Sequence, residues 1–434
     1  MKIGFVSLPL SGHLHPMTAL ARKLKFRGHE VVFIGVPDVG PVVRAAGLDF
    51  ISYCETEYPV GSIAEVYAPI SKLHGTEVIR YQGRKLSPPF TAVALESLPE
   101  KLLESGVEAL VLDAAHLFME LVPMRLGMPY VHIWNVLHLD FSGASPMCFF
   151  GWPHETSAQA MQRNVEGLQF VGEAIQPLVE VAMAHAEKVG LQVDWSVPGS
   201  TLSRLAIISQ TPKGFDFPEI PWPENFYYAG PFHDDQGRAS VPFPWEKLTG
   251  APLIYASLGT LVNGLDYLYK TILAAVERIP NIQVVLSVGK NIDLESLGTI
   301  PPNTIVVRSA PQIELLKRAE LCITHAGLNT ALESLAQGVP MVAIPVGYDQ
   351  PGVAARIAYH GVGEFIEVED LTVEGLSGLI ETVLKKGGYH DRARHFQRVI
   401  AETRGLDRAA DVIEQVFVKD RAQEALQEDA AQRI

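Results

Sequence analysis

Short apolar runs alternate with longer amphipathic segments along most of the chain, a pattern that predicts a parallel α/β sheet with helices on its faces. The first repeat is complete: residues 3–8 (IGFVSL) predict a buried strand, 17–28 (MTALARKLKFRG) a helix ended by its last glycine, and 31–36 (VVFIGV) the next strand. The turn before this helix, residues 9–16, contains His13. Ligands of doubly wound sheets bind outside the carboxyl ends of the strands, so this turn is a candidate site.

Two interruptions break the pattern in the first half of the chain. Residues 55–95 have weak periodicity, with a helix expected only after Pro88-Pro89, and residues 138–153 are rich in aromatic and small side chains. The other elements predicted in this half are a strand at 107–115, a helix at 118–127, a strand at 128–136, a long helix within 155–190 and a closing strand within 205–218.

A polar stretch near the middle of the chain predicts a domain boundary. Residues 232–252 contain glycine and several prolines and lack periodicity, and we place the boundary near residues 233–245. The length of 434 residues also favours two domains of about 200 residues each. We therefore expect an N-terminal domain over 1–235 and a C-terminal domain over 246–434.

The second half repeats the alternation of strands and helices. Its predicted strands lie within 253–260, 282–289, 304–312, 319–325, 341–345 and 363–368, and its predicted helices at 265–279, between Asn329 and Gly338, at 351–361 and, as two or more helices, through the remainder to a frayed end.

Composition excludes several classes of protein. Apolar residues make up 47% and charged residues 19% of the chain, values typical of a well-packed globular protein. The formal net charge of −14 argues against nucleic acid or an anionic membrane as the main partner. The three cysteines are far apart and form no metal-binding pattern, which indicates a reducing compartment. No apolar stretch reaches the roughly 20 residues that span a bilayer, and no signal peptide is recognisable, so we expect a soluble cytoplasmic protein.

The stretch 309–350 carries the most specific chemistry. A predicted strand ends in His325, and a helix capped by Asn329 or Thr330 follows a short turn of small residues. Such a helix N-terminus is an anion site, because its free N–H groups and positive dipole end face the crevice. Ordinary α/β packing is the alternative, since Thr330 and Glu333 fit a capping box in which Glu333 only closes its own helix.

Other strand exits carry further candidate groups. His13 follows the first strand and Asp113 ends a later strand of the same sheet, so both can face one crevice. From position alone, His13 could equally be a polar residue at a helix start and Asp113 a helix cap. In the second half, residues 257–260 (SLGT) could cradle a phosphate through hydroxyl and N–H groups, or form only a tight turn.

These motifs together resemble those of the UDP-sugar glycosyltransferases (GT1), the inverting family that glycosylates small lipophilic compounds. The signature box is matched by Ala310-Pro311-Gln312, His325-x-Gly327-x-Asn329-Thr330-x-x-Glu333, Gly338-Val339-Pro340, Pro345 and Asp349-Gln350. Ser11-Gly12-His13-x-x-Pro16 is similar to the family's N-terminal motif, and SLGT to its Ser-x-Gly-Ser/Thr turn. Ser309 stands where plant members carry a tryptophan that stacks on uracil, which leaves the base preference open. The form of the box is closest to bacterial macrolide and zeaxanthin glucosyltransferases.

The resemblance implies the GT-B fold: two doubly wound Rossmann-like domains facing across a cleft, the acceptor on the first, the donor on the second, and the last helix packing back on the first. It implies that His13 is the general base and that Asp113 orients it. The donor, most simply UDP-glucose, would be bound by Ser257, Thr260, Ala310, Gln312, His325, Gly327, Asn329, Thr330, Glu333, Asp349 and Gln350. The acceptor would be lined by Phe141, Phe149, Phe150 and Trp152, with core packing of these rings as the alternative.

The resemblance also implies a role for most of these donor-binding residues. Ser257, His325, Asn329 and Thr330 would stabilise the departing diphosphate, Gln312 and Glu333 would hold the ribose, and Asp349 with Gln350 the sugar hydroxyls. The sequence contains no Asp-x-Asp pair, so we expect no metal and no cofactor beyond the UDP-sugar co-substrate.

The expected partners are therefore a UDP-sugar and a small lipophilic acceptor such as a flavonoid or other phenol, a carotenoid or a polyketide, and the expected state is a monomer. Two alternatives stay open. One is a nucleotide-sugar epimerase of the same fold, which would need no acceptor base at His13. The other is a non-catalytic nucleotide-sugar-binding protein, in which the pairing of His13 with Asp113 would have no explanation.

Overall fold

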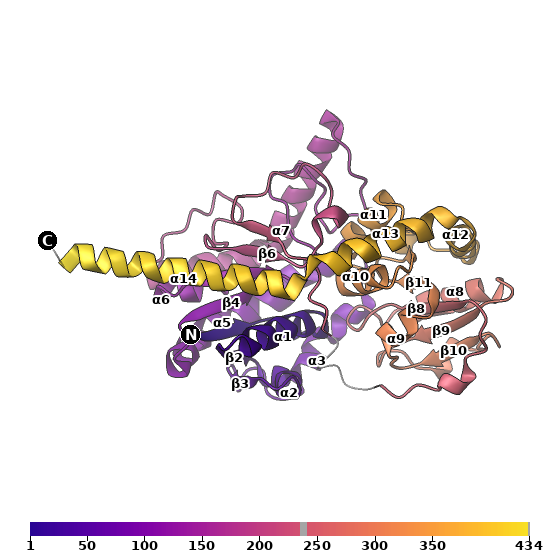
Figure 1. Cartoon of the computed structure of the whole chain (residues 1–434), viewed down its shortest axis with the longest axis horizontal. Helices are drawn as coiled ribbons and strands as arrows, with labels where there is room; N and C mark the ends of the chain where they lie inside the picture. The colour runs from indigo at the N-terminus through magenta and orange to yellow at the C-terminus, as the bar shows by residue number, and fades with distance from the viewer. Residues whose placement is uncertain (235–240, 433–434) are drawn as a thin grey trace.

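Two parallel β-sheets lie next to each other in the computed structural model, which describes residues 1–234 and 241–432 (Figure 1). The first sheet has seven strands in the order β3-β2-β1-β4-β5-β6-β7, and the second has six in the order β10-β9-β8-β11-β12-β13. Every neighbouring pair is parallel. Two doubly wound α/β units were predicted, and this strand order confirms them.

The strands of the first sheet, in chain order, are β1 (Lys2–Val6), β2 (Glu30–Gly35), β3 (Asp49–Ser52), β4 (Ala109–Asp113), β5 (Tyr130–Trp134), β6 (Ile207–Ser209) and β7 (Phe226–Tyr228). Those of the second are β8 (Leu253–Ser257), β9 (Gln283–Ser287), β10 (Thr304–Val307), β11 (Ala319–Thr324), β12 (Met341–Ala343) and β13 (Gly363–Phe365).

The α-helices of the first unit are α1 (Ser11–Phe26), α2 (Gly40–Ala45), α3 (Ser62–Tyr67), α4 (Thr76–Tyr81), α5 (Ser87–Ser105), α6 (Leu121–Leu126) and α7 (Ala158–Val189). Those that follow are α8 (Asp266–Glu277), α9 (Gln312–Leu316), α10 (Leu328–Ala336), α11 (Gln350–Tyr359), α12 (Val373–Lys385), α13 (Gly387–Thr403) and α14 (Gly405–Gln432). Short 3₁₀ or π turns are η1 (Pro37–Val39), η2 (Ala68–Lys72), η3 (Gln82–Leu86), η4 (Lys213–Phe215), η5 (Trp245–Lys247), η6 (Glu295–Leu297) and η7 (Val368–Asp370).

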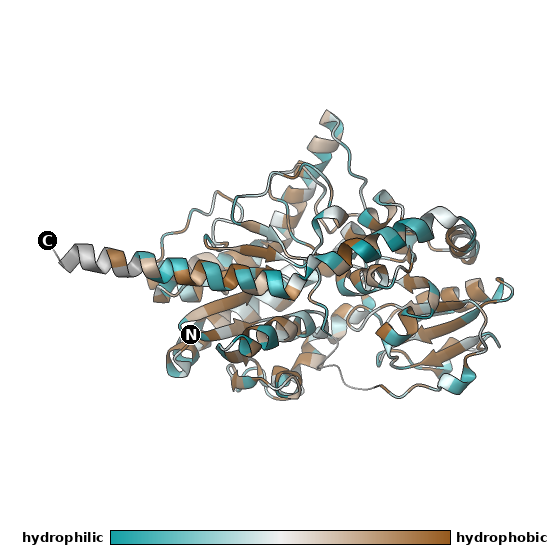
Figure 2. Ribbon diagram, in the orientation of Figure 1, coloured by the Kyte–Doolittle hydropathy of each residue, from teal (hydrophilic) through white to brown (hydrophobic). Residues whose placement is uncertain are grey.

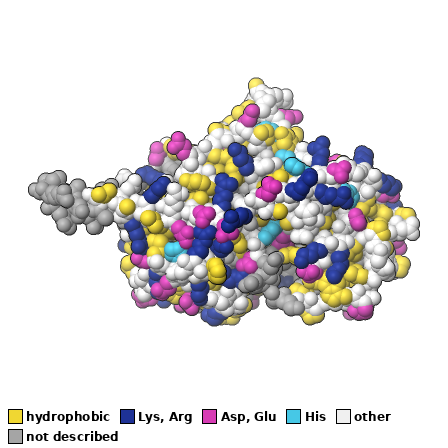
Figure 3. Space-filling view, in the orientation of Figure 1, with side chains coloured by type: hydrophobic (Ala, Val, Ile, Leu, Met, Phe, Trp, Pro, Cys, Tyr) yellow, Lys and Arg dark blue, Asp and Glu magenta, His cyan; other side chains and the backbone are white. Residues whose placement is uncertain are grey.

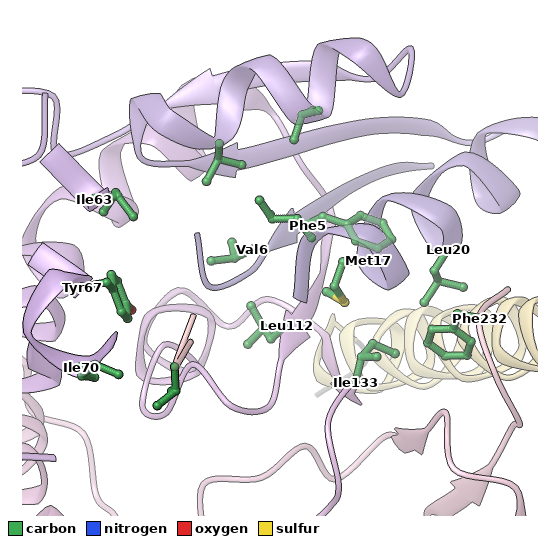
Figure 4. Close-up of a cluster of buried hydrophobic side chains, with 14 of the residues drawn as sticks. Phe5, Val6, Met17, Leu20, Ile63, Tyr67, Ile70, Leu112, Ile133 and Phe232 are labelled. Atoms are coloured by element: carbon green, nitrogen blue, oxygen red, sulfur yellow. The ribbon is translucent and has the colours of Figure 1, made fainter. Parts of the chain in front are cut away.

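The central strands are apolar because helices cover both faces of each sheet. Figure 2 shows the strands in brown and amphipathic helices around them. In the core of the first unit, Met17 and Leu20 of α1 pack with Phe5 of β1, Leu112 of β4 and Ile133 of β5 (Figure 4). This packing fixes the first turn of α1 at the carboxyl ends of β1 and β4.

Two predictions about this unit need correction, and a third lies partly outside the described residues. Helix α1 begins at Ser11 and not at residue 17, because Leu14 and Pro16 are already buried with the core side of the helix. Strand β7 follows the strand that was predicted to close the unit, and its three residues are too few to give a periodic signal. Within the predicted boundary at 233–245, residues 235–240 lie outside the described residues.

The C-terminal helix α14 runs back along the first unit beside α1 (Figure 1). The Arg27 guanidinium donates from Nη1 to Asp411 Oδ1 at 2.6 Å and to Glu414 Oε2 at 2.8 Å, and from Nη2 to Asp407 Oδ1 at 3.1 Å. Phe417 of α14 is fully buried. On the face that α14 crosses, basic and acidic side chains are interspersed (Figure 3).

A buried ion pair joins α11 to the first unit. Asp216 Oδ1 accepts hydrogen bonds from Arg356 Nε at 2.9 Å and Nη2 at 2.7 Å, and its Oδ2 accepts one from His138 Nε2 at 2.7 Å. Burial alone would raise the pKa of Asp216, but the charges of His138 and Arg356 outweigh burial and hold that pKa far below its ordinary range.

We expect Arg356→Met to lower the free energy of unfolding by about 3–5 kcal/mol, because it leaves a buried carboxylate without its main counter-ion. The depressed pKa of Asp216 means that the pair stabilises the fold above the unfolded carboxyl pKa, near 4, and that this contribution is lost as pH falls below it. Arg356→Met raises the pKa of Asp216 in the folded state, so acid unfolding of the variant begins at higher pH.

Urea unfolding between pH 2 and 8 measures both effects. Arg278→Met is the matched control, since Arg278 and its partner Glu374 are 52% and 72% exposed and the change should cost at most about 1 kcal/mol. Equal losses in the two variants would contradict the prediction.

Candidate functional site

A cavity of ≈ 1090 Å³ lies between the carboxyl ends of the two sheets and is lined by residues of both. The cavity lies at the topological switch point of each sheet. This point falls between β1 and β4 in the first sheet and between β8 and β11 in the second, where the chain connections turn to opposite sides. The loops that leave these four strands supply its most polar groups. His13 follows β1, Asp113 ends β4, Ser257 ends β8 and His325 follows β11.

His13 is in the first turn of α1 and is paired with Asp113 across the switch point. Its Nδ1 lies 2.9 Å from Asp113 Oδ2, and the His13 and Asp113 side chains are 12% and 0% exposed. The same Oδ2 accepts hydrogen bonds from Ser7 Oγ at 2.9 Å and from the Leu8 N–H at 3.2 Å. The carboxylate is thus fixed from three directions, and the imidazole leaves Nε2 for the cavity.

The electrostatics of the pair follow from burial and charge. Burial raises the pKa of Asp113, but the His13 charge and the hydrogen bonds from His13, Ser7 and Leu8 outweigh it and lower that pKa to about 2. Burial lowers the pKa of His13, yet the charge and hydrogen bond of Asp113 more than compensate, so that the pKa is raised above its ordinary value. Asp113 is therefore ionised, and His13 is a stronger base than a free imidazole.

The alternative role of Asp113 as a helix cap does not hold. The next helix, α6, begins only at Leu121, and Asp113 Oδ1 accepts a hydrogen bond from the Ala115 N–H at 3.1 Å within the loop. The alternative for His13 was a polar residue at a helix start. His13 does lie in the first turn of α1, but its side chain is bonded to Asp113.

On the other wall, His325 is held between two glycines. A Cβ atom on Gly259 or on Gly327 would come within 2.5 Å of His325 Nε2, and Gly259 has a φ of +77° that favours glycine. Burial lowers the pKa of His325 to about 4, against an opposing hydrogen bond with the Ser257 main chain. The imidazole is therefore neutral near pH 7 and has a hydrogen-bond donor for an anion without a charge that must be desolvated.

Helix α10 begins at Leu328 with Gly327 as its N-cap residue and has no side-chain cap. The prediction that Asn329 or Thr330 caps it is therefore wrong, and the capping box is not formed. Glu333 Oε2 instead accepts a hydrogen bond from Gln312 Nε2 at 2.6 Å, a partner at the start of a separate helix, α9. The N–H groups of this helix start are left for a ligand, which favours the anion-site interpretation.

The start of α11 closes the cavity beside His13. Asp349 is buried, and its Oδ2 accepts a hydrogen bond from the Leu137 N–H of the first unit at 2.8 Å. Burial raises the pKa of Asp349, although the Leu137 bond and the His13 charge oppose this. Gln350 Oε1 accepts from the Val346 and Gly347 N–H groups at 2.8 Å and 3.0 Å, which fixes the loop that carries Asp349.

Most of the predicted donor-site residues lie together in this cavity wall. The lining includes Ser257, Thr260, Gln312, His325, Gly327, Asn329, Thr330, Glu333, Asp349 and Gln350. Ala310 is outside the lining and packs against the core of the second unit. In the loop between β8 and α8, Thr260 contacts the first unit, because its Oγ1 lies 3.0 Å from Ser11 Oγ of α1.

The aromatic residues separate into two groups. Phe149 lines the cavity, whereas Phe141, Phe150 and Trp152 do not. Phe150 and Trp152 stack on each other with ring centroids 4.0 Å apart, and both press on Gly167 of α7. Three of the four predicted acceptor rings therefore lie away from the cavity: Phe150 and Trp152 pack on Gly167 of α7, and Phe141 lies against Gly199.

Sequence reasoning missed further polar residues of the lining, among them His116, Asn135 and Gln210. All three follow strands of the first sheet, at the same edge as His13. Burial lowers the pKa of His116 to about 4, so it is neutral beside the ionised Asp113. Their position after a strand was the available signal, but strand exits are too common to select them.

No group of three or more His, Cys, Asp or Glu side chains within the described ranges 1–234 and 241–432 is arranged to hold a metal ion. In the same part of the chain, no helix is long and apolar enough to cross a bilayer.

Known proteins are similar to this chain in sequence and in fold. The sequence profile described as "UDP-glucoronosyl and UDP-glucosyl transferase" matches residues 215–427. The chain is 28% identical over 414 residues to the zeaxanthin glucosyltransferase of Pantoea ananas, with 95% of each chain covered. It is 31% identical over 414 residues to the oleandomycin glycosyltransferase of Streptomyces antibioticus, covering 95% of this chain and 90% of that one.

Among solved structures, the "Glycotransferase of kitacinnamycin" superposes with a TM-score of 0.71 at 23% identity, over 96% of this chain and 98% of that one. This likeness confirms the predicted GT-B fold.

Proposed function

The chain belongs to the UDP-glycosyltransferase family, and on that premise we propose that it transfers glucose from UDP-glucose, with inversion, to a hydroxyl group of a small lipophilic acceptor. Its membership makes it a hexosyltransferase that uses a nucleotide-sugar donor. The observation that carries the proposal is the His13–Asp113 pair: His13 lines the cavity opposite the helix start at α10, and the buried Asp113 is bonded to its Nδ1.

In the proposed reaction, His13 Nε2 takes the proton of the acceptor hydroxyl while the acceptor oxygen attacks the anomeric carbon. The bond from that carbon to the diphosphate oxygen breaks, and its electron pair leaves with UDP. Asp113 holds the proton on Nδ1 of His13, which fixes the tautomer, and stabilises the imidazolium that forms. Attack from the side opposite the leaving group inverts the anomeric configuration.

The leaving diphosphate is assigned to the wall formed by Ser257, His325 and the N-terminus of α10. Neutral His325, the free N–H groups of α10 and its dipole would stabilise the developing negative charge. Asp349, with Oδ2 held by the Leu137 N–H, keeps Oδ1 for a sugar hydroxyl. Gln312 and Glu333, joined to each other, are placed to hold the ribose.

The acceptor is assigned to the part of the cavity formed by the first unit. Its wall there is mainly apolar, with Ile63, Tyr67, Phe90, Phe149 and Leu178. Two relatives are named for a carotenoid and a macrolide acceptor, zeaxanthin and oleandomycin. An apolar wall suits the largely apolar surfaces of such compounds, and we extend the proposal to phenols of similar size.

UDP release from UDP-glucose tests the function, with a panel of phenols, polyene alcohols and macrolides as acceptors. We expect release that depends on the acceptor and continues in EDTA, since the helix start is proposed to act in place of a metal. UDP-glucose binding without release by any acceptor would instead favour an epimerase or a binding protein. An epimerase would show itself by a changed sugar in the recovered nucleotide.

Gly259→Ala is expected to weaken UDP binding at least tenfold. The new Cβ would come within 2.5 Å of His325 Nε2 and displace the imidazole that is proposed to contact the diphosphate. Titration calorimetry with UDP measures the affinity.

Gly250→Ala is the matched control for the backbone cost. Gly250 also has a positive φ, +84°, but no atom lies within 4 Å of its added Cβ. Both variants should lose about 1 kcal/mol of stability through the backbone conformation. Unchanged UDP affinity in a folded Gly259→Ala variant would exclude the assigned role of His325.

A further inference from the structure

A closed ring of hydrogen bonds links the donor wall to the base, and it runs through Gln210, which has no role in the reaction described above. We propose that Gln210 is a positioning residue that holds the start of α10 at a fixed place relative to His13. The inference rests on the proposed function for its kinetic consequence, and on geometry alone for its structural one.

Gln210 directly follows β6 and is 2% exposed. Its Nε2 donates to two oxygens: the main-chain carbonyl of Asn135 and, at 2.8 Å, the side-chain Oδ1 of Asn329. Asn135 belongs to the first unit and Asn329 to the second, so a single buried amide joins the two sheets inside the cavity. Since both acceptors are buried or partly buried neutral groups, each bond is sheltered from competing water.

Asn329 is the second residue of α10, and its amide continues the ring. While Oδ1 accepts from Gln210, Nδ2 donates to the carbonyl oxygen of Gly12 at 2.7 Å. Gly12 directly precedes His13. In a regular helix the Gly12 carbonyl would accept from the N–H four residues later, but that residue is Pro16, which has none. Pro16 thus frees the carbonyl that Asn329 occupies.

Asn135 completes the ring at the base itself. Its Nδ2 donates to the His13 main-chain oxygen at 3.5 Å, a long contact, while its own main-chain oxygen accepts from Gln210. Gly12 and His13 are therefore connected to Gln210 by two routes, one through Asn329 and one through Asn135. Gln210 is the member that touches both routes.

The consequence concerns distance within the reacting assembly. Transfer needs the acceptor oxygen, the anomeric carbon and the departing diphosphate oxygen in line, with His13 Nε2 in hydrogen-bond reach of the acceptor hydroxyl and the diphosphate bound at α10. Small displacements of such groups are costly in rate. Because Gln210 touches neither proton nor diphosphate in the proposed reaction, its loss should disturb the geometry and leave the chemistry of each group intact.

Gln210→Leu keeps a side chain of similar size, removes both donated bonds and also removes the oxygen to which the Phe232 N–H donates at 3.5 Å. We expect kcat to fall by about 10- to 100-fold, with the UDP affinity within twofold of the parent, because Gln210 itself is assigned no contact with UDP. The ascending limb of the pH profile should stay in place, because Asp113 still sets the pKa of His13. A purely structural defect would instead lower the melting temperature and the UDP affinity together.

Thr211→Val is the matched control. Thr211 is the next residue, is fully buried, and its Oγ1 has no hydrogen-bond partner. The change alters the same loop without removing a bond, so kcat should stay within twofold. Gln210→Glu gives a second test, because its carboxylate keeps the shape but cannot donate to Asn135 or Asn329.

Hydrogen–deuterium exchange without ligand tests the ring separately from the activity. Gln210→Leu and Gln210→Glu should speed exchange in residues 8–16 and 328–333 together, although these segments belong to different units. Unchanged exchange in both segments, or an equal change in Thr211→Val, would overturn the inference whatever the reaction is. Faster exchange in a chain that transfers no sugar would uphold the ring and reject the proposed function.

Discussion

Replacing His13 with alanine is expected to lower kcat for acceptor glycosylation by about 10³-fold, within the 10²- to 10⁴-fold range of general-base catalysis. The variant retains the donor wall, which is formed by the second unit, so UDP should bind as it does to the parent. The acceptor hydroxyl, in contrast, would have to lose its proton to water in a partly closed cavity. Product analysis by liquid chromatography, beside UDP titration calorimetry, separates the two effects.

His15→Ala is the natural comparison. It removes a histidine that lies in the same helical turn as His13 and that the proposed reaction does not use. It should keep most of the activity. If His13→Ala retained a tenth or more of the parental kcat while folded, another group would have to be the base, and an epimerase or a binding protein would become the better account.

Asp113→Asn is expected to have a comparable effect, a loss of about 10³- to 10⁴-fold at pH 7. The asparagine fits the same space, but its NH₂ group donates where the carboxylate accepts. It can therefore hold His13 with the proton on Nε2, the tautomer that cannot take a proton from the acceptor. The positive charge that forms on His13 would also lose its counter-ion.

The pH profile gives this variant a signature that misfolding would not produce. His13 acts in its neutral form, so kcat/KM rises with pH through the pKa of His13, which Asp113 raises above its ordinary value. Without that charge, burial dominates and lowers the pKa. The ascending limb should therefore move to lower pH in Asp113→Asn, while the plateau falls.

Ser7→Ala supplies a graded control for the same carboxylate. It removes one of the hydrogen bonds to Asp113 Oδ2 and leaves the charge and His13 in place. We expect less than a tenfold loss and a limb near the parental position. An acid shift as large as that of Asp113→Asn would mean that the limb does not report on the His13–Asp113 charge pair.

Local periodicity predicted most strands and helices, because each buried strand or two-sided helix leaves its pattern in a few adjacent residues. It also placed His13, Asp113, Ser257 and His325 after strands, where doubly wound sheets bind ligands. That these strands lie at the two switch points depends on strand order, which pairs segments far apart in the chain. The resemblance supplied that information, and the structure then brought His13 to within 2.9 Å of Asp113.

The misplaced features share a physical cause. Whether Phe150 and Trp152 face a ligand or a helix depends on where a small residue, Gly167, presents a gap in α7. Glu333 fits a local capping rule, yet it bonds instead to Gln312 at the start of another helix, α9. Gln210 stands out only after its partners in both units are known. Such outcomes depend on tertiary contacts, which short-range patterns do not encode.

Because α14 packs on the first unit, a chimera of two relatives cannot exchange the first unit as residues 1–234 alone. An exchange of residues 1–234 alone would place Arg27 of one parent against the acidic residues of another parent's α14, where Asp407, Asp411 and Glu414 now bind it. The first unit is thus discontinuous: residues 1–234 together with 405–432. A chimera that takes both segments from one parent keeps this contact, and its two crossing points lie side by side, since a Cβ on Gly405 would fall within 2.2 Å of the Pro231 carbonyl oxygen.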